Sequence, residues 1–239
     1  INDDQIRIIM KFTIFQHVPY ESPGYILDWI IENGHSIEEV NFYDHPKLPA
    51  VKSTENLIVM GGPMNIYDDD EFSWLPEERD FVKKAIQQGT KVLGVCLGSQ
   101  FIADALDAAV FKNEHKEVGW FDVDVKDENL PEMFRGIFPK TFKTFHWHGD
   151  TFNMLDGIKS FVSTKATANQ AFIKENVAAF QFHMEMKPEG VDALIRHNET
   201  LFEEDLPFVQ KPGQMLHMNE LHESNRKILF QFLNTFFEG

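Results

Sequence analysis

The sequence predicts an α/β fold built on an open, mostly parallel central sheet with helices on both faces. Short apolar segments alternate with amphipathic ones over the first hundred residues, as in repeated strand–helix units. Glycines follow several of these segments directly, where a parallel strand turns into a helix or a helix stops. A period-two pattern, typical of antiparallel strands, enters only after residue 117.

The first hundred residues supply the parallel strands and the helices between them. The segment 6–15 is apolar enough to be a central strand, and Gly34 and Gly89 are placed as the C-terminal stops of helices. The apolar run 56–60 ends at Gly61-Gly62-Pro63, which predicts a strand followed by a tight loop. We expect strands at 6–15, 36–43, 56–60 and 91–95, and helices at 23–33, 75–88 and 99–106.

The second half of the chain mixes short strands with two helices. The alternating segment 120–125 predicts part of an antiparallel hairpin, and 177–183 is apolar enough to return to the core. Further strands are expected at 141–146 and 160–163, and helices at 188–204 and 219–237. With no repeat and no linker, we predict one domain over 1–239, with a core at about 6–187 and a helical C-terminal extension at 188–239.

Composition excludes several classes of function. The 239 residues carry a net charge of −16 and no cluster of Lys and Arg, which argues against nucleic acid and anionic membrane surfaces as partners. No apolar run reaches the ~20 residues of a membrane span, and no signal peptide is recognisable. A single cysteine excludes an internal disulfide and fits a reducing compartment, so we expect a cytoplasmic protein.

That cysteine, Cys96, lies in a glycine-flanked turn between a predicted strand and a predicted helix. Gly94-Val95-Cys96-Leu97-Gly98 has the form of a nucleophile elbow with cysteine in place of serine. The glycines permit a sharp turn, and the helix N-terminus favours the thiolate. Although an isolated cysteine is more often a buried apolar side chain, this context predicts a nucleophile.

A thiol nucleophile needs a base, a group that orients the base, and an oxyanion hole. His183 is the best candidate base because it ends an apolar strand, and Glu185 two residues later would project to the same side. For the oxyanion hole we predict the backbone N–H groups of Leu97 and Gly62. All of these lie at predicted carboxyl ends of strands, where sites form in open parallel sheets.

Metal binding is the weaker interpretation of two histidine-rich or acidic stretches. His146 and His148 would share one face of a strand and, with Asp150, suggest a metal site, but no third ligand has convincing spacing. The acidic run 68–71 fits no calcium loop and is better explained as a solvated loop. With no glycine-rich ATP loop either, we expect neither a metal nor a cofactor.

Three segments together resemble a class I glutamine amidotransferase domain, and their order along the chain matches as well. They are Gly61-Gly62-Pro63, Gly94-Val95-Cys96-Leu97-Gly98-Ser99-Gln100 and Gln181-Phe182-His183-Met184-Glu185. The likeness extends over about 6–185 and is greatest to stand-alone members similar to the glutaminase domain of GMP synthase, whose segments are like Glu117-Val118-Gly119-Trp120 and His148-Gly149-Asp150. The resemblance implies a flavodoxin-like fold.

The same resemblance implies a reaction. Cys96 would attack the side-chain amide of glutamine, form a γ-glutamyl thioester and release ammonia, and water activated by His183 would then release glutamate. Gln100 matches the residue that holds the substrate, Asp150 matches the one that binds its α-ammonium group, and His148 lies in the same segment. Met184 stands where the family commonly has proline.

The leading hypothesis is therefore a thiol-dependent glutamine amidotransferase or amidohydrolase. In one version a separate protein partner accepts the ammonia, and in the other the chain alone hydrolyses γ-glutamyl peptides or related compounds. The alternatives are a non-catalytic or redox-sensing relative, in which Cys96 is a reactive thiol, and a thiol esterase. The complete set Cys96, His183 and Glu185 argues against the first alternative, and Gln100 and Asp150 argue against the second.

Overall fold

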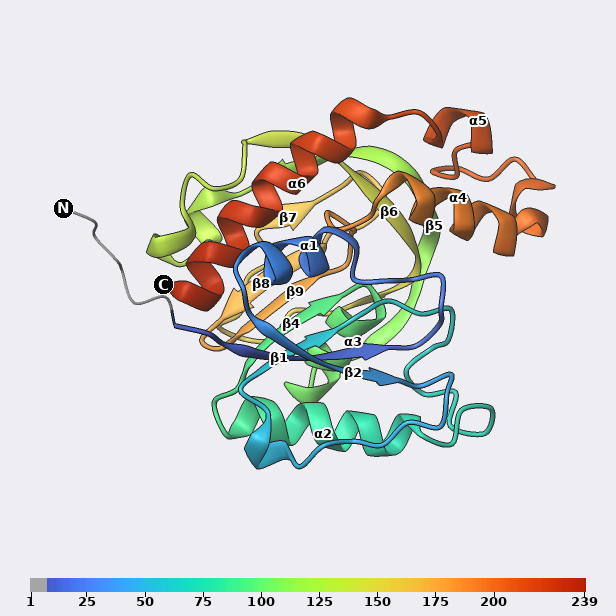
Figure 1. Ribbon diagram of the computed structural model, residues 1–239. Coiled ribbons are helices and arrows are strands. Elements are labelled where there is room, and N and C mark those ends of the chain that lie inside the picture. Colours follow the sequence, from blue (N-terminus) through green and yellow to red (C-terminus); the bar gives the residue numbers. More distant parts are fainter. Residues whose placement is uncertain (1–7) are drawn as a thin grey trace.

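The computed structural model describes residues 8–239, in which a mixed sheet of nine strands forms the centre of the α/β fold (Figure 1). The strand order is β2-β1-β3-β4-β9-β8-β7-β5-β6. The first five strands in this order are parallel to one another, in the 2-1-3-4-5 order of flavodoxin-like sheets. They are β2 (Ser36–Asn41), β1 (Lys11–Gln16), β3 (Asn56–Val59), β4 (Lys91–Val95) and β9 (Val177–Phe180).

The other half of the sheet is antiparallel. It consists of β8 (Ala171–Lys174), β7 (Val162–Ser163), β5 (Val110–Val125) and β6 (Thr141–Phe152). The long β5–β6 hairpin contains the two predicted segments but is much longer than both, with an irregularity between Lys112 and Glu117. Many of the added residues are polar and show no regular apolar alternation, so they form strand because they pair with the neighbouring strand. The short strand β8 was not predicted.

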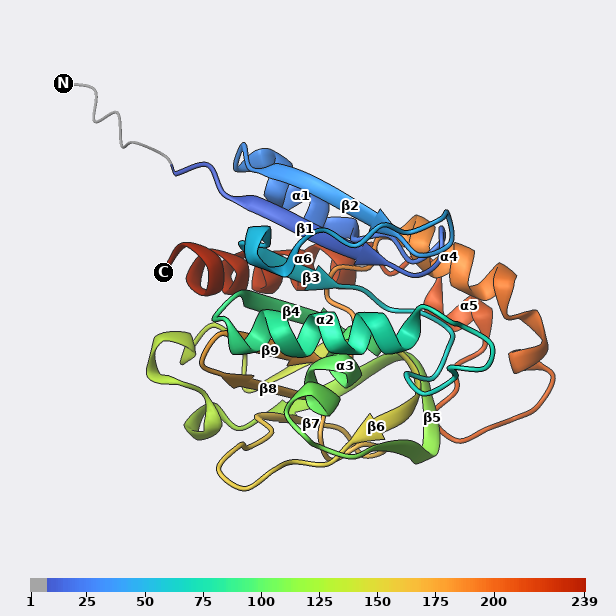
Figure 2. The ribbon, with the colours of Figure 1, turned by 90° about the horizontal axis from the view of Figure 1, so that it is seen from below.

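Helices cover both faces of the parallel half, as the sequence predicts. In Figures 1 and 2, α1 (Gly24–Glu32) and α6 (Asn219–Leu233) lie on one face, and α2 (Leu75–Gln87) and α3 (Leu97–Ala105) on the other. Each face has its own buried cluster, with Trp29 and Phe232 on the first and Phe81 and Phe101 on the second. No helix within residues 8–239 is long and apolar enough to cross a membrane.

Several predicted boundaries shift. The first strand begins at Lys11, and residues 6 and 7 of that prediction lie outside the described residues. The predicted strand 177–183 ends at Phe180, although His183 still forms an isolated antiparallel bridge with Phe145. The predicted helix 188–204 consists of α4 (Pro188–His197) and a 3₁₀ turn, Glu199–Phe202, because Asn198 leaves helical geometry with φ −133° and ψ 36°.

The C-terminal residues complete the core. The short α5 (Pro212–Met215) precedes α6, and a π-turn, Asn234–Glu238, continues that helix. The ring centroids of Phe232 and Phe180 are 4.8 Å apart, so α6 packs directly on β9. Trp29 Nε1 donates a hydrogen bond to Asn234 Oδ1 at 2.6 Å, which ties α1 to the end of the chain. Residues 188–239 therefore contain three α-helices, α4, α5 and α6, and contribute to the packed core.

Candidate active site

Cys96 occupies a strained turn between β4 and α3. Its φ of 52° lies in the region that side chains avoid, at a cost of about 1–3 kcal/mol. A Cβ on Gly94 would overlap the backbone at Gly98, and a Cβ on Gly98 would overlap the backbone of Val59. The two flanking glycines are thus required by close backbone approach, and the strand–turn–helix predicted around Cys96 is present.

The carboxyl ends of β3, β4 and β9 converge on one point. A methyl group on Gly61, just after β3, would stand 3.5 Å from Cys96 Cβ and 3.4 Å from His183 Cε1. The predicted nucleophile and base are therefore near neighbours although 87 residues separate them in the sequence, 96 to 183. The parallel topology explains this, because it gathers successive strand ends at one edge.

The imidazole of His183 is held on one side by a carboxylate. His183 Nδ1 lies 2.7 Å from Glu185 Oε1, and both side chains are 2% exposed. The bridge to Phe145 holds the backbone, since His183 N donates to Phe145 O at 2.8 Å. With Nδ1 committed to Glu185, Nε2 is the nitrogen left for chemistry, and it has no hydrogen-bond partner among residues 8–239.

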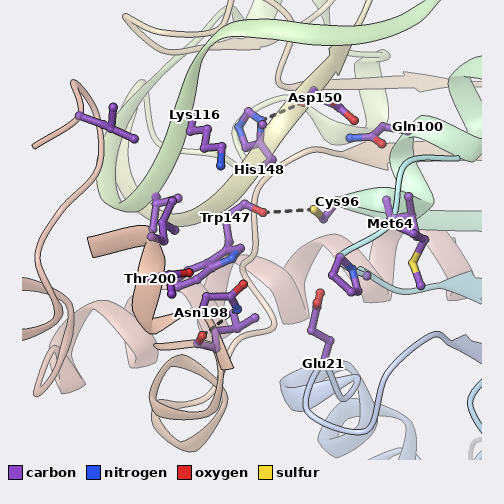
Figure 3. A pocket seen from close by; sticks show the side chains of 18 of the residues that line it. Glu21, Met64, Cys96, Gln100, Lys116, Trp147, His148, Asp150, Asn198 and Thr200 are labelled. Carbon is purple, nitrogen blue, oxygen red and sulfur yellow. Dashed lines mark hydrogen bonds between the residues drawn. The ribbon is translucent and has the colours of Figure 1, made fainter. Parts of the chain in front are cut away.

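The thiol of Cys96 is equally confined. Its Sγ donates to the carbonyl oxygen of Trp147 at 3.5 Å (Figure 3). Gln181 Nε2 lies 3.8 Å from the same sulfur. Burial raises the pKa of this thiol above its ordinary value, and His183 opposes that rise. A positive charge at His183 therefore favours the thiolate form of Cys96.

Electrostatics favour that charge. Burial alone would lower the pKa of His183, but the carboxylate of Glu185 and the thiol of Cys96 outweigh it and raise the pKa well above the usual value. An imidazolium at this position faces a carboxylate on one side and a nascent thiolate on the other. The arrangement can take a proton from the thiol, hold it, and return it to a leaving group.

The predicted oxyanion-hole residues lie beside the sulfur. Leu97 is the first residue of α3, so its amide N–H falls outside the hydrogen-bond ladder of the helix. A methyl group on Gly62 would stand 3.0 Å from Leu97 Cδ2, which places the two residues next to each other. Both residues line the same cavity as Cys96.

The cavity has a volume of about 520 Å³ and contains the predicted substrate-binding residues (Figure 3). Gln100 donates to Gln181 Oε1 at 3.2 Å, and Asp150 Oδ2 accepts from Asn65 Nδ2 at 2.7 Å. His148 Nδ1 lies 3.0 Å from the carbonyl oxygen of Asp150. Of the predicted site residues, Gly62, Cys96, Leu97, Gln100, His148 and Asp150 line the cavity, with His183 and Glu185 buried behind it.

Sequence reasoning missed a second carboxylate at the sulfur. Glu21 lines the cavity, is 6% exposed, and lies so near Gly61 that a methyl group there would overlap its carboxylate. Burial raises the pKa of Glu21, and its charge in turn adds to the rise in the pKa of Cys96. The loop after the first parallel strand opens at the same sheet edge as Cys96, and that position could have identified this residue.

One wall of the cavity comes from the C-terminal extension, which the sequence analysis left without a role. This wall runs from the last turns of α4 to residue 206 and combines apolar side chains with two carboxylates, an amide and a hydroxyl. Its residues are Leu194, Asn198, Thr200, Leu201, Glu203, Glu204 and Leu206. The cavity lining also includes Lys116 and Trp147 of the β5–β6 hairpin, so the cavity extends well beyond the immediate surroundings of Cys96.

Comparison with known proteins decides the family. A family model described as glutamine amidotransferase class-I matches residues 25–201, well over half of the chain. The chain belongs to this family. A glutamine amidotransferase-like protein of Salmonella typhimurium, YfeJ, is 28% identical over 195 residues, which are 80% of this chain and 82% of that protein. The GMP synthase of Wolinella succinogenes is 30% identical over 66% of this chain, but the match spans only 30% of the synthase.

Solved structures agree with the fold of this amidotransferase. A glutamine amidotransferase from Methylobacillus flagellatus has a TM-score of 0.87 and covers 97% of this chain and 95% of its own. One from Thermotoga maritima has a TM-score of 0.86 and covers 97% and 100%. Both are 24% identical to this amidotransferase, so they bear on architecture, and they confirm the flavodoxin-like fold that the resemblance implies.

Proposed function

We propose that this amidotransferase cleaves the γ-glutamyl amide of glutamine or of a glutamine-like compound through a thioester on Cys96. One observation carries the proposal. Cys96 in its strained elbow and the His183–Glu185 pair meet at one wall of a cavity that also contains Gln100 and Asp150. This combination supplies a nucleophile, an oriented base and polar groups for a glutamyl moiety.

The proposed reaction follows from the positions of these groups. The Cys96 thiol gives its proton to His183 Nε2, and the thiolate attacks the amide carbon, while the N–H groups of Leu97 and Gly62 receive the developing oxyanion. His183 then protonates the leaving amine, and the C–N bond breaks to leave a γ-glutamyl thioester. A water molecule, deprotonated by His183, attacks the thioester and releases glutamate, and the proton returns to the sulfur.

The size and walls of the cavity favour the stand-alone version of this function. A volume of about 520 Å³ lies in the range of pockets that take a whole small-molecule ligand. Residues 194–206 line the same cavity as Gln100 and Asp150, and we assign this wall to the leaving group. We therefore place a γ-glutamyl compound with a substantial amine portion ahead of free glutamine as substrate.

Delivery of ammonia to a partner protein is the second candidate. It is favoured by the similarity to a glutamine-hydrolysing GMP synthase subunit of Sulfolobus acidocaldarius, which is 28% identical over 63% of this chain and 78% of the relative. The name of that relative makes it one component of a larger enzyme. In this version the glutaminase would remain slow until the partner binds.

Glutamate release tests the proposal. Purified protein is assayed with glutamine and with a panel of γ-glutamyl peptides and amines, with Cys96→Ala as the control. Release that depends on Cys96 and is faster with the larger substrates supports the stand-alone hydrolase. Labelling of Cys96 by a glutamine-like electrophile without turnover supports the partner-dependent version, and neither release nor labelling would favour a non-catalytic or redox-sensing relative.

A further inference from the structure

The β5–β6 hairpin carries three buried side chains of metal-ligating type on one face. Glu117 of β5 pairs directly with His148 of β6. His146 lies two residues before His148, so its side chain is on the same side of β6. The exposed fraction is 1% for Glu117, 6% for His148 and 0% for His146. One ligand-type atom from each can be chosen so that all lie within 4.8 Å of one another. Glu117, His146 and His148 are called the hairpin cluster below.

The spacing of the hairpin cluster suits a small cation. Glu117 Oε2 lies 3.4 Å from His148 Nε2 and 3.8 Å from His146 Nδ1. In a tetrahedral zinc site with bonds of about 2.0–2.2 Å, neighbouring donor atoms stand about 3.4 Å apart. The three side chains could therefore close around one ion with small rotations at their tips.

Unpartnered polar atoms gather at the same place. Glu117 Oε1, both ring nitrogens of His146 and Gln170 Oε1 are buried and have no hydrogen-bond partner among residues 8–239. Buried polar atoms are normally paired, and an unmade bond of this kind is costly. All of these atoms except the one protonated nitrogen of a neutral His146 ring offer lone pairs, so they call for a hydrogen-bond donor or a cation. The short distances between the ligand-type atoms of the cluster favour one shared cation.

The outer contacts orient these donors. His148 Nδ1 lies 3.0 Å from the carbonyl oxygen of Asp150, which can only accept, so Nδ1 carries the proton. The lone pair on Nε2 of the neutral ring then faces Gln170 Nε2 at 3.5 Å, next to Glu117 Oε2 at 3.4 Å. Glu117 Oε2 accepts from Gln170 Nε2 at 2.7 Å and from Thr167 Oγ1 at 3.0 Å. In metal sites, a ligating histidine usually donates its other ring N–H to a carbonyl or carboxylate oxygen, and a ligating carboxylate usually accepts hydrogen bonds from neighbouring groups.

We infer that the hairpin cluster binds one divalent transition-metal ion, zinc in preference, through Glu117, His146 and His148, with the fourth position left to solvent. Two imidazoles and a carboxylate suit zinc, whereas calcium and magnesium favour all-oxygen sites. Asp150, which the sequence places beside the two histidines, instead accepts a hydrogen bond from Asn65. The inference is independent of the proposed function.

The bound ion would hold a wall of the cavity in place and would take no part in the reaction itself. His148 and Asp150 line the cavity, and Trp147 accepts the hydrogen bond of the Cys96 thiol, so the ligating stretch of β6 is also a cavity wall. A metal bridging β5 and β6 beneath this stretch would fix the register of the wall. Cys96 is not part of the hairpin cluster, so the ion takes no part in the thiol chemistry.

Direct binding measurements test the inference. Protein freed of metal with a chelator is titrated with Zn²⁺ by calorimetry and with Co²⁺ by visible absorption. We expect one equivalent of each, with the intense ligand-field bands of a four-coordinate Co²⁺ site and no comparable response to Mg²⁺. Glu117→Gln and His146→Asn should each weaken Zn²⁺ binding by at least about 100-fold, above the loss caused by removing a second-shell partner.

Two matched controls separate this site from other ligands. Cys96→Ala should bind Zn²⁺ as the natural protein does, and so should His115→Asn, which removes a partly exposed histidine from the same strand as Glu117. Loss of binding in Cys96→Ala but not in the cluster variants would place the ion on the active-site thiol and overturn the inference. Failure of the natural protein to bind Zn²⁺ would do the same and leave the cluster as a hydrogen-bonded network that includes water.

Folding of the variants is checked by circular dichroism, because a buried network is altered. Should neither cluster variant fold, X-ray absorption at the zinc edge of the natural protein still decides. A first shell of nitrogen and oxygen with the scattering of two imidazoles supports the inference. A sulfur ligand, or an ion surrounded by water oxygens, contradicts it.

Discussion

Glu185 Oε1 and His183 Nδ1 lie 2.7 Å apart, and this contact sets both the tautomer and the charge of the imidazole. The carboxylate holds a proton on Nδ1 and leaves Nε2 for the substrate side. It also raises the pKa of His183 against the effect of burial, which would lower it. A group whose pKa is raised on folding stabilises the protein below its unfolded pKa, and this contribution is lost as the pH rises through the folded value.

Replacing Glu185 tests this relationship. Glu185→Gln should lower the pKa of His183, move the alkaline limb of kcat/KM for glutamate release to lower pH, and reduce the maximum by at least about 10²-fold. The pH profile of the variant is compared with that of Glu189→Gln, which removes the charge of an exposed carboxylate on α4 and should leave the alkaline limb in place. An unshifted limb in Glu185→Gln would assign it to another group.

Replacing Cys96 separates chemistry from stability. Cys96→Ala removes one sulfur from a buried site and should cost no more than about 1 kcal/mol of unfolding free energy, while glutamate release falls to background. Because Cys96 is the single cysteine of the chain, labelling by a thiol reagent should fall to zero in parallel. Residual turnover at the natural rate would refute a cysteine nucleophile.

The elbow glycines give a prediction about backbone packing. Gly98→Ala would drive a methyl group into the backbone of Val59 and should destabilise the protein by about 1–3 kcal/mol or more, with loss of activity. Gly213→Ala is the matched control, because a Cβ there meets nothing within 4 Å. Chemical denaturation of both variants measures the difference, and equal stabilities would mean that β3 and α3 can move apart at no cost.

Glu21 should influence the thiol through its charge. Glu21→Gln removes one carboxylate beside Cys96 and should lower the pKa of the thiol, so that alkylation of Cys96 begins at lower pH. Glu204→Gln, at the outer wall of the same cavity, serves as the control and should leave the alkylation profile unchanged. A profile that is identical in Glu21→Gln and the natural protein would indicate that Glu21 is already uncharged.

The parallel half of the fold could be predicted because its signals are local. Apolar runs, helix-ending glycines and the turn around Cys96 act over a few residues, and the order of the strand ends then follows from topology. His183 lies near Cys96 although its strand stops at Phe180, since the bridge to Phe145 holds it at the same edge. The assignment of Glu185 as its partner rested on spacing, and the 2.7 Å contact agrees with it.

Contacts set by the register of paired strands were beyond such reasoning. Glu117 meets His148 because the β5–β6 register pairs them next to an irregularity, and nothing in the spacing of the histidines indicates that partner. The length of the hairpin has the same origin, since its polar residues become strand only by pairing. Glu21 was missed because a single acidic residue in a loop gains meaning only from the neighbours that folding brings to it.

The wall formed by residues 194–206 enters the fold after the last of the proposed reacting residues, Glu185. In the proposed reaction, bond breaking and the choice of leaving group therefore depend on separate stretches of the polypeptide. On this proposal, exchange of residues 194–206 between related chains would change the amine that is accepted and leave the residues around Cys96 intact. Substrate preference could then diverge among relatives through changes in this late segment alone, without changes at the strand ends.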